Sequence, residues 1–370
     1  MSSDPASRAG AVLEIDLGGI VANWRMLAQK AAPAACAAVV KANAYGLGAV
    51  PVAETLLSAG CRLFFVATLD EGIALRGVLG PDAEIAVFNG PLPGTAAEFA
   101  AHRLIPVLND PGQIEAWKGQ SGLPAMLHID TGMSRLGLTA REFAALADAL
   151  PKCGIAWRAV ISHLACADTP EHKLNELQRS RFTAAARRVA RVPASLAASS
   201  GIFLGSSYHF DLVRPGAALY GVNPQPGNPN PLRQVVRLTG KIVQVREIDR
   251  GESVGYGAAH VMKTAGRVAT VAVGYADGWL RSLSQRGCGY LSGKRVSLLG
   301  RVSMDLVTFD VSAIDPALAY PGAVIELLGE HYGVDDAAAD AGTIGYEMLT
   351  ALGTRYHRIY RDPAAANRPK

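Results

Sequence analysis

Short apolar runs recur along the first 222 residues and alternate with segments of helical periodicity. Eight such runs lie at 35–40, 62–67, 83–88, 104–108, 124–129, 157–162, 194–198 and 209–213. Between several of them, stretches such as 70–80, 94–102 and 139–150 carry apolar residues at a spacing near 3.6 and begin with polar residues. This alternation predicts repeated βα units and a parallel sheet that is buried on both faces.

Eight parallel strands are the number that closes a (β/α)8 TIM barrel, and a doubly wound open sheet is the alternative. Polar side chains follow several of the runs directly, among them Lys41, Asp130, His163 and Arg214. Active sites of barrels lie at the carboxyl ends of the strands, so this shared placement favours the barrel. We therefore predict an α/β fold with an N-terminal (β/α)8 TIM barrel over residues 12–232.

The pattern changes after residue 222. Residues 223–234 are rich in Pro, Asn and Gly and predict a linker. Alternating stretches at 237–248 and 266–275, with Gly-containing turns between later ones, predict a β-rich C-terminal domain over 233–370. The segment 340–353 is expected to form one helix that closes it. The early run 11–16 precedes the first barrel helix and is a candidate to pair with this second domain.

Composition excludes several classes of protein. With 49% hydrophobic and 18% charged residues, the 370-residue chain can bury large cores and does not resemble a disordered protein. The net charge of +4 comes without the Lys/Arg block that nucleic-acid or lipid-surface binding requires. The five cysteines are scattered, with no C-x-x-C pair, which predicts neither a disulfide framework nor a metal site. No signal peptide or membrane span is recognised, so we expect a cytoplasmic protein.

A set of motifs along nearly the whole chain resembles one family. In chain order they are VVKANAYGLG (39–48), DTGMSRLG (130–137), SHLACAD (162–168), LVRPGAALYG (212–221), SVGYG (253–257), GYADGW (274–279) and VSMD (302–305). They resemble the motifs of alanine racemases, barrel-type enzymes that use pyridoxal 5'-phosphate. The resemblance implies an isomerase that interconverts L- and D-alanine and supplies D-alanine for peptidoglycan.

By this resemblance, Lys41 is the lysine that binds the cofactor covalently and serves as base on one face of the substrate. Burial in apolar surroundings lowers the pKa of a lysine, and only a neutral amine attacks an aldehyde or accepts a proton. The resemblance places the second base, Tyr256, on the opposite face and brings it from the partner subunit of a homodimer. Removing and returning a proton on opposite faces requires two such groups.

The resemblance also assigns the cofactor and substrate contacts. Arg214 is expected at the pyridine nitrogen; because arginine offers only donors, that nitrogen would stay unprotonated. His163 is expected in the hydrogen-bonded chain between that nitrogen and the tyrosine. The remaining expected cofactor contacts, mostly around the phosphate, are Tyr45, Ser200, Gly216 and Ala217. The expected substrate contacts are Arg135, Met304 and Tyr275.

Three positions depart from the family pattern. Many members carry a carbamylated lysine where this chain has His128, seven residues before Arg135. Imidazole forms no stable carbamate, so we expect another anion, such as chloride, or an acidic side chain to orient Arg135. Leu47 replaces a histidine of the lysine motif, and Thr354 replaces a tyrosine that helps to bind phosphate in some members.

Three other functions stay open from the sequence alone. A broad-specificity amino-acid racemase would share the architecture and differ in pocket size. A barrel-type pyridoxal-phosphate decarboxylase would carry an acidic residue at the ring nitrogen, and Arg214 disfavours it. A non-catalytic carrier of the cofactor would need no β-rich half with Tyr256.

Overall fold

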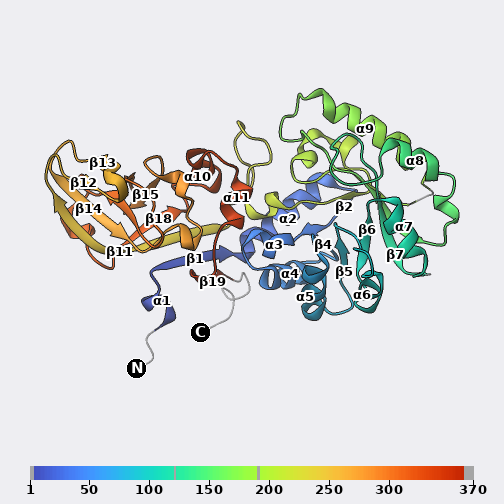
Figure 1. Ribbon diagram of the computed structural model, residues 1–370, viewed down its shortest axis with the longest axis horizontal. Helices are drawn as coiled ribbons and strands as arrows, with labels where there is room; N and C mark the ends of the chain where they lie inside the picture. Colours follow the sequence, from blue (N-terminus) through green and yellow to red (C-terminus); the bar gives the residue numbers. More distant parts are fainter. Residues whose placement is uncertain (1–3, 121, 190–191, 362–370) are drawn as a thin grey trace. The chain divides into compact units, whose positions relative to one another are not determined.

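The computed structural model describes residues 4–120, 122–189 and 192–361 (Figure 1). The chain divides into two compact units. The barrel unit comprises Ile20–Leu219 and Asn223–Leu232, and the β unit comprises the described parts of Met1–Gly19, Tyr220–Val222 and Arg233–Lys370.

Parallel strands form the centre of the barrel unit. The strands are β2 (Ala35–Cys36), β3 (Ala38–Val39), β4 (Leu63–Val66), β5 (Glu84–Val87), β6 (Ile105–Leu108), β7 (Pro124–His128), β8 (Ala156–Ile161), β9 (Ala194–Ser195) and β10 (Leu212–Val213). β3 to β9 pair in sequence order as one parallel sheet. β4 and β6 are buried at every residue, as expected for strands that are covered on both faces.

β10 connects the two edges of this sheet. It pairs in parallel with β2, which leads directly into β3, while Arg214 forms a bridge with Ala198 just after β9. The amide of Val39 donates to the carbonyl of Pro215, and the amide of Arg214 donates to the carbonyl of Ala197. The eight predicted runs are therefore the strands of a closed barrel, and the predicted fold is confirmed.

Helices follow most of these strands on the outside of the barrel (Figure 1). They are α4 (Ala49–Ser58), α5 (Leu69–Leu79), α6 (Ala96–Ala101), α7 (Pro111–Lys118), α8 (Ala140–Leu146) and α9 (Lys173–Ala186), while α2 (Leu17–Ala31) precedes the first strand and the short element α3 (Lys41–Tyr45) directly follows β3. Thr68 and Thr139 begin α5 and α8 with capping boxes completed by Glu71 and Glu142. Because a capping box requires particular polar side chains, Thr68 and Thr139 indicate the starts of these two helices in the sequence.

The β unit is built on an eight-stranded sheet in the order β14-β17-β16-β15-β18-β11-β1-β19. Its strands are β1 (Ala11–Asp16), β11 (Val236–Ile248), β14 (Gly266–Val271), β15 (Cys288–Leu291), β16 (Lys294–Leu299), β17 (Val307–Asp310), β18 (Val324–Leu328) and β19 (His357–Arg361). β14 also pairs with β11, which closes the six strands from β14 to β11 into an antiparallel barrel. The short hairpin of β12 (Ser253–Val254) and β13 (His260–Val261) and the short helix α1 (Pro5–Arg8) also belong to this unit.

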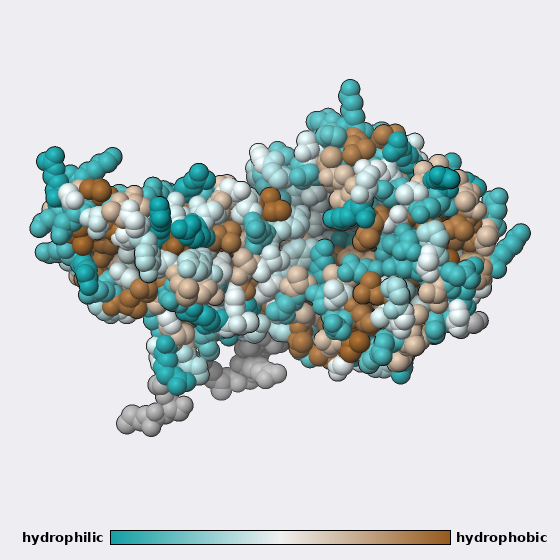
Figure 2. Space-filling view, in the orientation of Figure 1, coloured by the Kyte–Doolittle hydropathy of each residue, from teal (hydrophilic) through white to brown (hydrophobic). Residues whose placement is uncertain are grey.

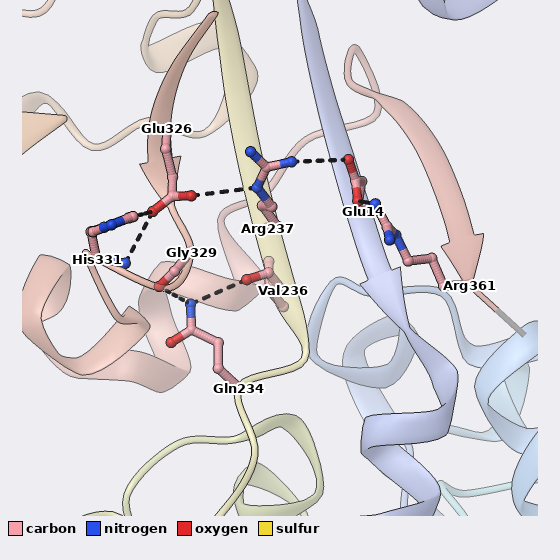
Figure 3. A network of polar contacts seen from close by, with 8 residues as sticks. All are labelled: Glu14, Gln234, Val236, Arg237, Glu326, Gly329, His331 and Arg361. Carbon is pink, nitrogen blue, oxygen red and sulfur yellow. Dashed lines mark hydrogen bonds and ion pairs between the residues drawn. The ribbon is translucent and has the colours of Figure 1, made fainter. Parts of the chain in front are cut away.

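A chain of ion pairs crosses four neighbouring strands of the β unit (Figure 3). Glu326 of β18 accepts from His331 and from Nε of Arg237, and Arg237 of β11 also reaches Glu14 of β1. Glu14 in turn pairs with Arg361 of β19. Each link joins a largely buried carboxylate to a more exposed cationic or imidazole side chain, and the series connects the strands at the two ends of the chain.

The segment 340–353 contains the end of one helix and the whole of another, so the prediction of one helix was wrong. α10 (Val334–Ala341) ends at Gly342, whose φ of 71° is left-handed, and α11 (Gly345–Thr350) begins three residues later. The amide of Gly342 donates back to the carbonyl of Ala339 and satisfies the end of the first helix. Apolar periodicity continues on both sides of this glycine, which concealed the break.

Hydrophobic and hydrophilic side chains are interspersed on the face drawn in Figure 2. Among the described residues, no helix has the length and apolar character needed to cross a membrane.

Candidate active site

Lys41 lies at the carboxyl end of β3, one residue after the strand's buried extension at Val40. The four residues after it, Ala42 to Tyr45, all have left-handed backbone angles, with φ between 51° and 55°. Left-handed angles are unfavourable for residues with a Cβ, and a run of four is rare. The short element α3 is therefore a strained left-handed turn, which reverses the chain directly behind the lysine.

The surroundings of Lys41 favour its neutral form. Burial lowers the pKa of the Lys41 amine below its usual 10.5, and the nearby Arg135 guanidinium lowers it further, while Glu71 acts in the opposite direction. The Phe88 ring, whose centre lies 5.8 Å from Nζ of Lys41, acts with Glu71 in favour of the charged form. A half-buried amine with a lowered pKa is suited to attack a carbonyl carbon.

Arg214 follows β10 and is 2% exposed. Its guanidinium donates to the hydroxyl of Ser195 and, at 2.6 Å, to the backbone carbonyl of Ser162. Burial lowers its pKa to about 10, so the group remains a cation at neutral pH. These contacts fix a positively charged donor at the same end of the barrel as Lys41.

His163 and His128 lie near the cationic side chains of Arg214 and Arg135. Burial lowers the pKa of His163 to about 3, and Arg214, Arg135, His128 and Lys41 all act in the same direction. Lys41, His163 and Arg214 follow β3, β8 and β10, and His128 ends β7, so the carboxyl ends of these parallel strands bring their side chains to one face of the barrel. The site concentrates positive charge, which suits an anionic ligand.

His128 is neutral with its proton on Nδ1. This nitrogen lies 2.7 Å from Oδ1 of Asn109, whose Nδ2 donates to the carbonyls of Phe88 and Val107. The amide orientation leaves Oδ1 as an acceptor, so His128 must donate from Nδ1. Burial and the nearby Arg214 lower the pKa of His128 to about 4.

A set of hydroxyls and amides lies beside Gly216. A Cβ at Gly216 would come within 2.4 Å of the Tyr45 hydroxyl, so only glycine allows this approach. The amides of Gly216 and Ala218 donate to the hydroxyl of Ser199 at 3.0 and 3.1 Å. Backbone amides beside hydroxyls form a fitting cradle for a phosphate group.

Ser199, more than the predicted Ser200, faces this cradle. Ser199 is buried with both amide contacts, whereas Ser200 is half-buried at the start of a 3-10 turn (Ser200–Leu204). The two serines are adjacent, and sequence alone does not decide which of them points inward. Ala217 is buried at the start of the next 3-10 turn (Ala217–Tyr220).

Arg135 is exposed on the loop between β7 and α8. Asp130 organises that loop, because its carboxylate accepts the amides of Gly132, Met133 and Ser134. Among the described residues, no acidic side chain forms an ion pair with Arg135.

The other three predicted residues belong to the β unit and are solvent-exposed. Tyr256 begins a 3-10 turn (Tyr256–Ala258) after β12 and is 72% exposed. Met304 is 54% exposed and Tyr275 is 42% exposed. The carbonyl of Met304 accepts the amide of Ala276, which ties the loops of Tyr275 and Met304 together.

Comparison with known proteins covers both units. Residues 15–224 match the family profile described as "Alanine racemase, N-terminal domain", and residues 235–360 match "Alanine racemase, C-terminal domain". The chain belongs to the alanine racemase family. It is 53% identical over 360 residues to the alanine racemase of Rhodospirillum rubrum, covering 95% of this chain and 96% of the relative.

Other members of the alanine racemase family extend this result. The catabolic alanine racemase of Mesorhizobium japonicum is 50% identical over 358 residues, covering 95% of this chain and 93% of the relative. The crystal structure of alanine racemase from Bartonella henselae, with covalently bound pyridoxal phosphate, superposes with a TM-score of 0.92 at 41% identity, covering 95% of this chain and all of that one. The biosynthetic alanine racemase of Pseudomonas aeruginosa gives a TM-score of 0.89 at 33% identity, covering 96% of this chain and all of that one.

The departures from the alanine racemase pattern have definite environments here. Leu47 is fully buried, so an apolar side chain fits where the family often carries a histidine. Thr354 is exposed. The ring of His128 is hydrogen-bonded through Nδ1 to Oδ1 of Asn109.

We expect His128 to make the protein less stable as the pH falls. Its folded pKa lies near 4 and its unfolded pKa near 6.5, so the unfolded state binds the proton first. The free energy of unfolding should fall as the pH drops from about 6.5 towards 4. His128→Gln keeps an N–H donor for Asn109 without titrating, so its thermal midpoint should fall less than that of the unmodified protein between pH 7 and 5.

The matched control is His102→Gln. His102 lies 3.7 Å from Glu98 on the outer end of α6, so its removal should not reduce the loss of stability in acid. Equal loss in the unmodified protein and in His128→Gln would contradict the assignment of His128 as a neutral, buried histidine.

Proposed function

We propose that this chain interconverts L- and D-alanine with pyridoxal 5'-phosphate attached to Lys41. The observation that carries the proposal is the convergence of Lys41, with its lowered pKa, and the buried cation Arg214 at one end of the barrel. Family membership supports the substrate and the cofactor. When bound, pyridoxal phosphate makes the C–H bond at the substrate's α-carbon acidic by withdrawing electrons from it.

Lys41 serves as the base on one face of the α-carbon. The turn behind it holds its backbone, and its lowered pKa leaves a larger fraction of the amine able to accept a proton near neutral pH. Arg214 would donate a hydrogen bond to the pyridine nitrogen and leave it unprotonated, because a guanidinium that stays a cation at neutral pH donates a hydrogen bond without transferring its proton. An unprotonated pyridine ring withdraws electrons from the α-carbon less strongly than a protonated one, which suits an enzyme that returns the proton to the same carbon.

The cradle beside Gly216 would hold the phosphate of the cofactor. Tyr45, Ser200 and the amides of Gly216 and Ala217 would be its donors. The Gly216 amide donates to the Ser199 hydroxyl in this structure, and that hydroxyl keeps its own proton to donate to the phosphate. His163 is proposed to link Arg214 to the tyrosine that serves as the second base. Its low pKa makes it a neutral relay that both donates and accepts.

The β unit of a second copy completes the site. We propose a homodimer in which Tyr256 of one subunit acts on the opposite face of the substrate held by Lys41 of the other. The exposure of Tyr256, Tyr275 and Met304 fits residues that await a partner surface. Arg135 and the backbone amide of Met304 would bind the substrate carboxylate, with Tyr275 beside the entry.

The five free cysteines support a reducing, cytoplasmic location. The biological role is proposed as supply of D-alanine for peptidoglycan. The relatives' names include both biosynthetic and catabolic enzymes, so expression in a strain that requires D-alanine is the direct check of this role.

The test of the activity uses the purified protein loaded with pyridoxal phosphate. L-alanine and D-alanine should each convert to the same racemic mixture, and in heavy water deuterium should enter the α-position. L-serine and L-lysine should react far more slowly. Comparable rates with lysine would favour a broad-specificity racemase, and no conversion of alanine would contradict the proposal.

A further inference from the structure

The left-handed turn behind Lys41 must be held by contacts from outside it. Ala42, Asn43, Ala44 and Tyr45 have φ values of 51°, 54°, 53° and 55°, and none of them is glycine. Such angles cost free energy at every residue and persist only where surrounding structure imposes them. The contacts that stabilise this strained segment also fix the backbone next to the reactive amine of Lys41.

Glu71, in the first turn of α5, supplies one such contact. Its Oε1 accepts the amide of Ala42 at 2.6 Å, the shortest of its contacts. Its Oε2 accepts the amides of Ala67 at 2.8 Å and Thr68 at 3.2 Å. One half-buried carboxylate thus joins three backbone donors, from the turn after β3 and from the turn between β4 and α5.

The hydrogen bond between Glu71 and the Ala42 amide lies next to Lys41 in the chain and therefore affects the position of the lysine. Ala42 directly follows Lys41, so the hydrogen bond fixes the peptide plane that leaves the Lys41 Cα. Another tie comes later in the turn, where Oδ1 of Asn43 accepts the amide of Ala49 in α4. Glu71 is therefore the side chain that anchors the turn at its lysine end.

Glu71 also supplies negative charge in a positive site. The pKa of Lys41 is lowered by burial and by Arg135, and Glu71 opposes both. Charge-assisted hydrogen bonds from backbone amides are stronger than neutral ones, so the carboxylate is suited to hold a strained turn.

We propose that Glu71 is a positioning residue for Lys41, whose carboxylate holds the left-handed turn and thereby fixes where the lysine amine points. This inference rests on the proposed role of Lys41 as the cofactor-binding lysine. It goes beyond that role by assigning a second residue, outside the set of cofactor and substrate contacts, to the same step.

The test compares Glu71→Gln with the unmodified chain. Glutamine has the same shape but only one acceptor oxygen, so its NH2 group must face a backbone N–H. Cofactor-free protein is mixed with pyridoxal phosphate over a range of pH, reduced with borohydride, digested, and the Lys41 peptide is quantified by mass spectrometry. We expect attachment about tenfold slower, the loss typical of one charge-assisted hydrogen bond. The pH midpoint of the rate should also move downward, because a neighbouring negative charge is gone.

Hydrogen exchange of the peptide that contains residues 41–48 gives a readout that needs no cofactor. Glu71→Gln should accelerate exchange there. Asp70→Asn removes an exposed carboxylate from the same helix turn and should change neither exchange nor attachment. Thr68→Val removes the hydroxyl that caps α5, 3.4 Å from the Glu71 amide, and should lower stability without shifting the pH midpoint.

The outcomes separate the two proposals. Attachment at Lys41 in the unmodified chain, with equal rate, midpoint and exchange in Glu71→Gln, would overturn the role of Glu71 alone. Thr68→Val reproducing every effect of Glu71→Gln would also overturn it, because Glu71 would then act only through helix stability. Absence of the cofactor from Lys41 in the unmodified chain would overturn both the proposed function and this inference.

Discussion

Lys41→Ala is expected to lower racemisation of alanine by about 10⁴-fold or more, because one side chain provides both the covalent link to the cofactor and a base. Lys41 is half-buried at the end of β3, and alanine fits that position without new strain. The loss should therefore appear in kcat while the thermal midpoint stays close to that of the unmodified protein. The measurement is the rate of D-alanine formation together with the cofactor retained after gel filtration.

Lys41→Arg is the matched control for charge. Arginine keeps a positive group at the strand end but remains protonated, so it neither attacks an aldehyde nor accepts a proton at neutral pH. It should be as inactive as alanine. Activity of Lys41→Arg within tenfold of the unmodified protein would contradict covalent attachment at this residue.

The strands of the barrel could be predicted because their sequences carry a simple signal. β4, at Leu63–Val66, and β6, at Ile105–Leu108, are apolar at every position, which is what burial on both faces requires. Helix starts such as Thr68 and Thr139 could also be recognised, because capping demands particular side chains. These features depend on neighbours in the sequence.

The features that sequence missed depend on contacts between distant residues. The turn after Lys41 contains no glycine, so nothing local indicates positive φ; distant contacts, such as that of Glu71, impose it. Glu71 itself looks like an ordinary acidic residue in the first turn of a helix. In the same way, the hydrogen bond of His128 to Asn109 joins two strand ends, and the sequence shows only two polar residues.

The residues of the candidate site also fall into those that the sequence pattern predicts and those that depend on distant contacts. The placement of Lys41, His163 and Arg214 at strand ends follows from the barrel, since parallel strands bring their carboxyl ends to one face. The choice between Ser199 and Ser200 depends on side-chain direction at a 3-10 turn, which periodicity does not determine. The residues of the β unit follow from family resemblance alone.

Tyr256→Phe is expected to be nearly inactive on its own, and mixing it with Lys41→Ala should restore activity. Phenylalanine lacks the phenolic oxygen that accepts and returns the proton, while the ring keeps its shape. If Tyr256 acts across a two-fold interface, a hybrid dimer has one site with neither group altered and one with both altered. Random exchange of subunits makes about half of the dimers hybrid, so about a quarter of the unmodified activity should return.

The recovery must depend on subunit exchange and on Tyr256 itself. Activity should rise with the hybrid fraction, measured by native mass spectrometry after the two proteins are mixed under mildly dissociating conditions. Tyr320→Phe removes the hydroxyl of another exposed tyrosine of the β unit and should be fully active alone, which shows that loss of a surface phenol is not enough to inactivate the enzyme. Hybrids that form without activity would place Tyr256 and Lys41 in the same subunit's site or remove Tyr256 from the chemistry. Because neither parent homodimer contains a complete pair, only a shared site can produce activity from two inactive proteins.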